Sequence, residues 1–434
     1  MKFGWVTPLA EASAIGRVNV AVCEELLARG HRVEIIRSEA PELLDLKAHP
    51  TSATVYRYTD VGLEHAQNEY DCLFVNIGDY YNYHAGVFKY LELPFSIGIF
   101  HDFCIYNLFC GWLEKHHSSS ASIHDAEMVG IYGEQVRPLA VRARSGEADL
   151  EEIARSAPMT EWLGRRCAAA VAHSPFYMSR LENSCPGPIG VAALPWPPRR
   201  LAPGDGEPKA RLILLTVGHV NTNKCVDRVI EALGSSPLLR RRIHYVVAGP
   251  IEKDMKDGLE LRASELGVSF VATGAIGDDQ LELRLSGSDI VCCLRKPVLE
   301  GASASAIEGM LSGKPILVAD AGFYSDLPDS LVVKVSAAAE VEEIKQRLEE
   351  LLHDPGRRLT IGNNAKIWAE ETFSVSRYAD AMLELASRRI AIDPLLSLNA
   401  KIAVELADIG LGGESSNVKR LAALIEGLTE TAER

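Results

Sequence analysis

The chain has 434 residues, 47% of them hydrophobic and 24% charged, with a formal net charge of −14 and a pI of about 5.4. This length predicts two domains, because a single core rarely extends past about 250–300 residues. The acidic balance argues against nucleic acid as a partner, since that binding depends on a basic surface that displaces counterions.

The N-terminal stretch MKFGWVTPLAEASA lacks the long apolar region of a secretory signal. No apolar run of the chain reaches the roughly 18–20 residues of a membrane-spanning helix. Nine cysteines without a CxxC pair are typical of reduced thiols. We therefore expect a cytoplasmic protein, and a position at the inner face of the membrane stays open.

The first half of the chain alternates apolar, β-branched runs with amphipathic stretches, as βα units on parallel sheets do. Residues 104–160 interrupt this alternation with expected helices around a serine-rich loop. We predict a Rossmann-like N-terminal domain over residues 1–190 with this helical insertion. Its expected strands lie at 2–6, 32–36, 72–78 and 95–100, its first helices at 17–29 and 84–93, and a loop at 7–16.

A proline-rich stretch then predicts a linker at 191–209. The alternation restarts over 210–375, and helices are expected over 376–434, the first of which should pack back toward the N-terminal domain. The fold class is therefore α/β, with two doubly wound domains that face a cleft and a helical C-terminal tail. In open parallel sheets, ligands bind at the carboxyl ends of the strands.

The segment EGASASAIEGMLSGKP, residues 300–315, carries the strongest motif. Ser303 is expected to cap a helix that ends at Gly313, and the free amides at that N-terminus would form an anion site. Glu308 lies more than one turn into the helix, where a carboxylate can accept hydrogen bonds from sugar hydroxyls. Taken alone, the segment is better explained as a capped helix with a surface glutamate.

A second motif, GHVNTNK, follows the first expected strand of the second domain at residues 218–224. A lysine at such a strand-to-helix junction can present its ammonium to a phosphate as a point charge. On its own, Lys224 could also be an exposed loop lysine.

Together, these ordered motifs resemble the nucleotide-sugar domain of the family-four glycosyltransferases, which are retaining enzymes of the GT-B fold. The resemblance is strong over residues 210–375, through TVGHVNTNKCVDRVIEAL and LRKPVLEGASASAIEGMLSGKPILVADAG. It is thinner in the N-terminal half, through TPLAEASAIG, IFHD and VAHSPFY. The family signature of two glutamates separated by seven residues corresponds to Glu300 and Glu308.

The resemblance implies a set of site residues. Lys224 would neutralise the donor diphosphate, Glu300 would bind the transferred sugar, and His101 would lie beside that sugar. The backbone at Ala275 and Ile276 would contact the base, and Glu308 the ribose. The other implied donor-binding residues are Gly16 in the first loop, Gly218, His219, Asn221, Arg295, Gly301, Ser303, Ala304 and Ser305.

One position departs from the family pattern. Many relatives have arginine directly after the glycine that corresponds to Gly218, and here that residue is His219. The second positive charge on the diphosphate is therefore expected from a hydrogen bond of His219 or from Arg295.

The function that this resemblance implies is transfer of a hexose, with retention, from a GDP- or UDP-sugar to a hydroxyl of a glycan or lipid-linked acceptor in polysaccharide or lipopolysaccharide biosynthesis. The acceptor would bind the N-terminal domain. Alternatives are a nucleotide-sugar epimerase or a phosphorylase of the same fold, and an inactive partner subunit that binds the donor.

No metal and no other cofactor are expected. His116, His117, His124 and Asp125 do not have the spacing of a structural zinc site. Short arginine clusters, such as Arg240–Arg242, leave peripheral membrane contact open, and a homodimer is a further partner left open.

Overall fold

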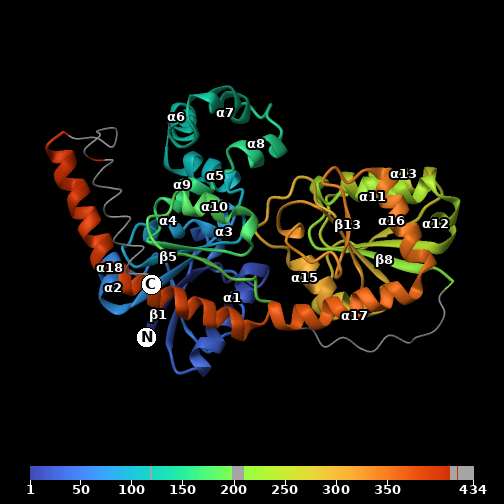
Figure 1. Cartoon of the computed structure of the whole chain (residues 1–434), viewed down its shortest axis with the longest axis horizontal. Coiled ribbons are helices and arrows are strands. Elements are labelled where there is room, and N and C mark those ends of the chain that lie inside the picture. Colours follow the sequence, from blue (N-terminus) through green and yellow to red (C-terminus); the bar gives the residue numbers. More distant parts are fainter. Residues whose placement is uncertain (118–119, 198–209, 411–417, 419–434) are drawn as a thin grey trace. The chain divides into compact units, whose positions relative to one another are not determined.

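The computed structural model describes residues 1–117, 120–197, 210–410 and 418 (Figure 1). The chain forms two compact units, Met1–Ala193 with Val375–Arg434, and Leu194–Ser374. Each unit is built on one parallel sheet. Of the linker predicted at 191–209, residues 198–209 lie outside the described part.

The first unit contains a seven-stranded sheet in the order β3-β2-β1-β4-β5-β6-β7. Its central strands are buried along their whole length because helices cover both faces, which explains their continuous apolar runs. The strands are β1 (Lys2–Thr7), β2 (Arg32–Arg37), β3 (Thr54–Arg57), β4 (Cys72–Ile77), β5 (Ser96–Phe100), β6 (Ala169–Ala172) and β7 (Ile189–Val191).

Helices of this unit connect successive strands and form the insertion. Between β5 and β6, most of the described residues of 106–164 are helical, and Figure 1 shows α6, α7 and α8 as an outer group of helices on this unit. The helices are α1 (Ala14–Ala28), α2 (Leu63–Glu69), α3 (Tyr81–His84), α4 (Val87–Tyr90), α5 (Tyr106–His116), α6 (Ser120–Tyr132), α7 (Arg137–Arg144), α8 (Leu150–Ser156), α9 (Thr160–Gly164) and α10 (Met178–Glu182), with 3₁₀ turns η1 (Pro41–Leu43), η2 (Glu134–Val136) and η3 (Pro175–Tyr177).

The long helix α18 (Val375–Asp408) returns the chain to the first unit. Tyr378, Met382 and Leu385 join the apolar core of that unit, where α18 packs against α1 and β7. At the surface, the guanidinium of Arg29, the residue after α1, pairs with Asp380 at 2.5 Å. The first half of α18 is therefore part of the N-terminal core, although it lies at the other end of the sequence.

The second unit contains a six-stranded sheet in the order β10-β9-β8-β11-β12-β13. The strand order reverses next to β8, as in doubly wound folds. The strands are β8 (Leu212–Val217), β9 (Ile243–Ala248), β10 (Ser269–Ala272), β11 (Ile290–Cys293), β12 (Ile316–Ala319) and β13 (Val333–Val335). The helices are α11 (Val226–Ser235), α12 (Pro237–Arg242), α13 (Lys253–Glu265), α14 (Asp278–Gly287), α15 (Ala304–Leu311), α16 (Val341–His353) and α17 (Pro355–Thr372), with 3₁₀ turns η4 (Thr222–Lys224) and η5 (Gly322–Tyr324).

Three local predictions for the first unit were wrong. Helix α1 begins at Ala14 rather than Arg17, because the Ser13 hydroxyl accepts the Gly16 N–H and caps the helix earlier. The single helix expected at 84–93 is two short helices, α3 and α4, that meet at Gly86. The described serines of the expected loop, Ser120 and Ser122, belong to α6.

Candidate functional site

The loops that follow β8, β10, β11 and β12 leave the second sheet at one edge, because all its strands are parallel. Every residue that the sequence analysis assigned to donor binding in this unit lies on these loops or on α15. The loop after β8 is tied to the loop after β11 by a hydrogen bond from Lys296 N to Asn223 O, 2.8 Å long. The carboxyl edge of this sheet therefore brings together residues from distant parts of the sequence.

Lys224 ends the turn η4, and its side chain is only 5% exposed. Its ammonium donates to the carbonyl of Val217, the last residue of β8, at 2.6 Å. Burial, followed by repulsion from Arg295, lowers the pKa of Lys224 to about 7. The lysine is thus not an exposed loop residue, and its charge is costly in the absence of an anion.

Because Gly218 has no side chain, the Lys224 ammonium can be approached from solvent at this position. The residue is exposed, has φ of +93°, and a Cβ atom at its position would lie 3.2 Å from Lys224 Nζ. A side chain here would be strained by the backbone and would crowd the ammonium. A ligand above Gly218 can consequently approach Lys224 closely.

Arg295, two residues after the end of β11, is also buried, at 8% exposure. Its Nε lies 3.2 Å from Glu300 Oε1, its Nη1 donates to Leu294 O at 2.9 Å, and its Nη2 donates to Ser305 Oγ at 3.2 Å. Burial alone would lower its pKa, but Tyr324 and Glu300 oppose this and the pKa is raised. Arg295 is therefore a permanent cation beside Lys224.

Helix α15 begins as the sequence predicted. Ser303 is its N-cap and accepts from Ala306 N, and Gly313 adopts φ of +71° after its end. The first-turn amides of Ala304 and Ser305 have no acceptor within the helix, and the helix dipole adds positive potential there. Gly301, which precedes the cap, is buried. This N-terminus lies next to Arg295, through Ser305, and suits an anion.

Glu308 lies in the second turn of α15 and is 8% exposed. On the neighbouring loops, Asn221 and Ala275 are exposed and Ile276 is partly exposed. His219 is exposed as well. The cation beside Lys224 in the structure is Arg295, and a role of Arg295 or His219 on the diphosphate stays a prediction.

Gly16 does not lie in a loop, contrary to the sequence analysis. It occupies the first turn of α1, where its N–H is bound to Ser13 Oγ at 3.0 Å. A Cβ atom at Gly16 would lie 2.7 Å from Pro8 O, so glycine is needed here for close contact between α1 and the preceding loop. A diphosphate contact of Gly16 stays a prediction, and its amide is already used by the cap.

His101 follows β5 and is buried among polar groups of the first unit. Its Nε2 lies 2.9 Å from Asn76 Oδ1, and its Nδ1 lies 3.3 Å from His173 Nε2. Burial, followed by the neighbouring His173 and His84, lowers the pKa of His101 well below its usual value. His101 is therefore a neutral imidazole with both ring nitrogens facing protein groups.

The histidines of the insertion show no sign of a metal centre. The His124 ring is bonded to Tyr106 Oη at 2.8 Å and to Asp125 at 2.9 Å. Among the residues that the structure describes, no group of three or more His, Cys, Asp or Glu side chains could hold a metal ion.

Lys224, Arg295 and Glu300 form a charged cluster, and one residue that contacts it was not predicted from the sequence. Tyr324, at the end of η5 after β12, is completely buried and donates its hydroxyl to Glu300 Oε1 at 2.7 Å. The two residues are 24 positions apart, and a tyrosine after an apolar strand carries no local signal of such a contact. The adjacency of β11 and β12 creates it.

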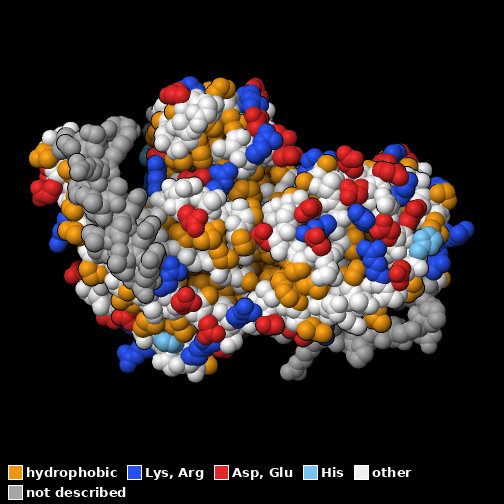
Figure 2. Space-filling view, in the orientation of Figure 1, with side chains coloured by type: hydrophobic (Ala, Val, Ile, Leu, Met, Phe, Trp, Pro, Cys, Tyr) orange, Lys and Arg blue, Asp and Glu red, His pale blue; other side chains and the backbone are white. Residues whose placement is uncertain are grey.

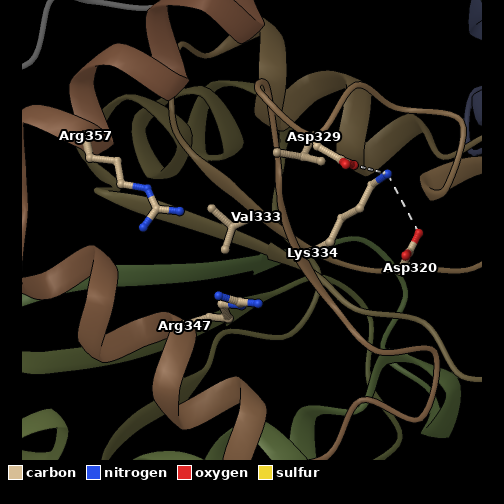
Figure 3. Close-up of a pocket in the computed structure, with 7 residues that line it drawn as sticks. Asp320, Asp329, Val333, Lys334, Arg347 and Arg357 are labelled. Carbon is tan, nitrogen blue, oxygen red and sulfur yellow. Dashed lines mark ion pairs between the residues drawn. The ribbon is translucent and has the colours of Figure 1, made fainter.

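A separate cavity of about 280 Å³ lies at the edge strand β13 and contains none of the predicted donor-binding residues (Figure 3). Its cations are already neutralised, since Lys334 pairs with Asp329 at 2.7 Å, and Arg347 and Arg357 both pair with Glu350. We therefore place the candidate site at the carboxyl edge of the sheet and not in this cavity.

The surface of the second unit that Figure 2 shows has acidic and basic side chains interspersed, without a continuous basic patch on that face. Within the described part of the chain, no helix combines the length and the apolar composition needed to cross a membrane.

Comparison with known proteins supports the resemblance found in the motifs. Residues 200–368 match the family Glycosyl transferases group 1. An MMP alpha-(1->4)-mannosyltransferase from Mycolicibacterium hassiacum is 27% identical over 216 residues. That match covers 47% of this chain and 49% of the mannosyltransferase, so it spans about half the length of this relative.

Solved structures of this type share the fold of nearly the whole chain. Sucrose-phosphate synthase from Thermosynechococcus elongatus superposes with a TM-score of 0.63 at 14% identity, over 90% of this chain and 99% of that one. Anabaena Alr3699/HepE, solved with UDP and glucose, superposes with a TM-score of 0.56 at 15% identity, over 89% and 99%. The predicted GT-B fold class is confirmed.

Proposed function

Because residues 200–368 match the family Glycosyl transferases group 1, we propose that this protein transfers a sugar from a nucleoside diphosphate donor to a hydroxyl of an acceptor. The observation that carries the proposal is the charged cluster at one edge of the second sheet. There, the cations Lys224 and Arg295 lie beside the N-terminus of α15, together with Glu300. Two cations and a helix N-terminus suit a diphosphate, and a carboxylate beside them suits sugar hydroxyls.

Within this proposal, Lys224 and Arg295 neutralise the diphosphate, and the amides at Ala304 and Ser305 bind its distal phosphate. Glu308 accepts from the ribose, and Glu300 accepts from the transferred sugar. The loop at Ala275 and Ile276 contacts the base. The burial of both cations strengthens their attraction for the phosphate, because solvent screening is weak there.

The chemical step needs charge stabilisation more than it needs a general base. Negative charge builds on the diphosphate as the bond to the anomeric carbon breaks, and the leaving phosphate can itself take the acceptor proton. Preorganised cations and amides lower that barrier without a metal ion. We propose retention at the anomeric carbon, in keeping with the family that the two-glutamate signature resembles.

The donor is proposed to be a UDP- or GDP-hexose. Alr3699/HepE has been solved with UDP and glucose, and the similar mannosyltransferase is named for a hexose transfer, which supports this class. The acceptor is proposed to be a glycan or a lipid-linked glycan, bound through the first unit.

The test begins with thermal shifts of the full chain with UDP, GDP and ADP and with their hexose conjugates. We expect one diphosphate to raise the melting temperature, and its sugar conjugate to be consumed when a glycan acceptor is added. The anomeric configuration of the product is then read from the proton NMR coupling of the new linkage.

Other outcomes would contradict the proposal. Conversion of the donor sugar without an acceptor would indicate an epimerase, and release of a sugar phosphate in the presence of inorganic phosphate would indicate a phosphorylase. Binding of the diphosphate without turnover of any donor would indicate an inactive partner subunit.

A further inference from the structure

The buried hydroxyl of Tyr324 meets the carboxylate of Glu300 at the end of two adjacent strands. Tyr324 Oη donates to Glu300 Oε1 at 2.7 Å, and Arg295 Nε lies 3.2 Å from the same oxygen. The neighbouring Phe323 ring packs edge-on against the tyrosine ring at 5.5 Å. The phenol therefore reaches Glu300 from a rigid, packed position.

Because Tyr324 and Arg295 both bind Oε1, the orientation of the second carboxylate oxygen of Glu300, Oε2, is restricted. Glu300 Oε2 accepts from Leu299 N at 3.3 Å, which is beyond the usual N–H···O range. A carboxylate offers about four lone-pair directions, so Oε2 retains capacity for a further donor. Glu300 is partly exposed, with 18% of its side chain accessible, so a ligand can reach it.

Both donors keep their protons under all ordinary conditions. Burial, and then the charge of Glu300, raises the pKa of the Tyr324 phenol well above its usual value. Arg295 has a raised pKa as well. Both hydrogen-bond donors to Glu300 are consequently retained.

We propose that Tyr324 is a positioning residue for the donor sugar. Its hydroxyl, with Arg295, holds Glu300 so that Oε2 accepts from a hydroxyl of the transferred sugar. This inference rests on the proposed function, in which Glu300 contacts the sugar and Lys224 contacts the diphosphate. Tyr324 itself touches neither, and it acts through Glu300.

The test is Tyr324→Phe, which keeps the buried ring and removes only the hydroxyl. We expect kcat with the nucleotide sugar to fall about 10- to 100-fold, the range for loss of a hydrogen bond to a charged group. The Kd of the nucleoside diphosphate alone should change less than about twofold, because the sugar is absent from it. A matched control is Tyr245→Phe, since Tyr245 is equally buried in the same unit and bonds to Thr216 at 3.0 Å; it should leave kcat unchanged.

A double-mutant cycle separates positioning from a structural role. In the Glu300→Gln background, Tyr324→Phe should lower kcat by less than about twofold further, because both changes disturb one interaction. Additive losses in the cycle, or wild-type kcat in Tyr324→Phe, would overturn the inference. Absence of turnover by the wild-type chain with every donor would instead overturn the proposed function on which the inference rests.

Discussion

Both units place polar side chains at the carboxyl ends of parallel strands, but the two groups differ in charge. In the second unit, Lys224 and Arg295 are buried beside Glu300. In the first unit, His101 follows β5, and its ring nitrogens contact His173 and Asn76. Burial lowers the pKa of the lysine and of both histidines.

The difference shows how burial, acting on different side chains, leaves a positive charge in one unit and neutral groups in the other. The histidines are held neutral, so they offer hydrogen bonds without a positive charge. Arg295 keeps its proton despite burial, because Tyr324 and Glu300 favour the charged form. The second unit therefore offers a permanent positive charge that can match a diphosphate, and the buried histidines of the first unit offer none.

The largest effect is expected on donor turnover, when a residue of the charged cluster is replaced. Lys224→Ala should lower donor turnover by about 10²–10³-fold, the usual loss when one preorganised group that stabilises transition-state charge is removed. Lys334→Met is the matched control, because Lys334 is also partly buried in this unit but pairs with Asp329 at the β13 edge (Figure 3). Steady-state kinetics with the identified donor measure both, and equal losses in the two variants would contradict the placement of the site.

The next effect is expected on the pH dependence of nucleoside diphosphate binding. With a pKa of about 7, free Lys224 loses its proton as the pH rises above 7, and the diphosphate prefers the ammonium form. The affinity of the nucleoside diphosphate should therefore fall by up to about tenfold per pH unit above pH 7, with uptake of a proton on binding. Titration calorimetry between pH 7 and 9 measures this slope. The Lys224→Met variant should show a much flatter profile, and an unchanged slope in it would exclude Lys224 as the source.

The last prediction concerns the neutral histidines and measures stability instead of activity or binding. Burial lowers the pKa of His84 and His173 to about 4, so the unfolded chain binds more protons than the folded chain between pH 6.5 and 4. The free energy of unfolding should then fall with decreasing pH by up to about 1.4 kcal/mol per pH unit for each histidine. Urea unfolding across this range measures the slope. His173→Gln should reduce it by one such increment, and an identical slope in the variant would contradict the assignment.

Much of the second unit could be predicted from sequence because its signals are local. The strand β11, the cap at Ser303, helix α15 and the glycine at 313 follow one another within 24 residues. The start of α1 was harder to locate, since a cap by Ser13 competes with a loop in a stretch of small residues. The serine-rich part of the insertion was predicted wrongly because serine favours loops only weakly, and packing of neighbouring helices overrides that preference.

Sequence by itself determined the two α/β halves and the spacing of Glu300 and Glu308 about a helix N-terminus, because hydrophobic period and capping act over a few residues. Only the tertiary structure decided that Arg295 and Tyr324 bind the same oxygen of Glu300, and that the Lys224 ammonium lies buried beside Gly218. These contacts arise where neighbouring strands end side by side. The order of strands in a sheet depends on packing of the whole unit and leaves no local trace.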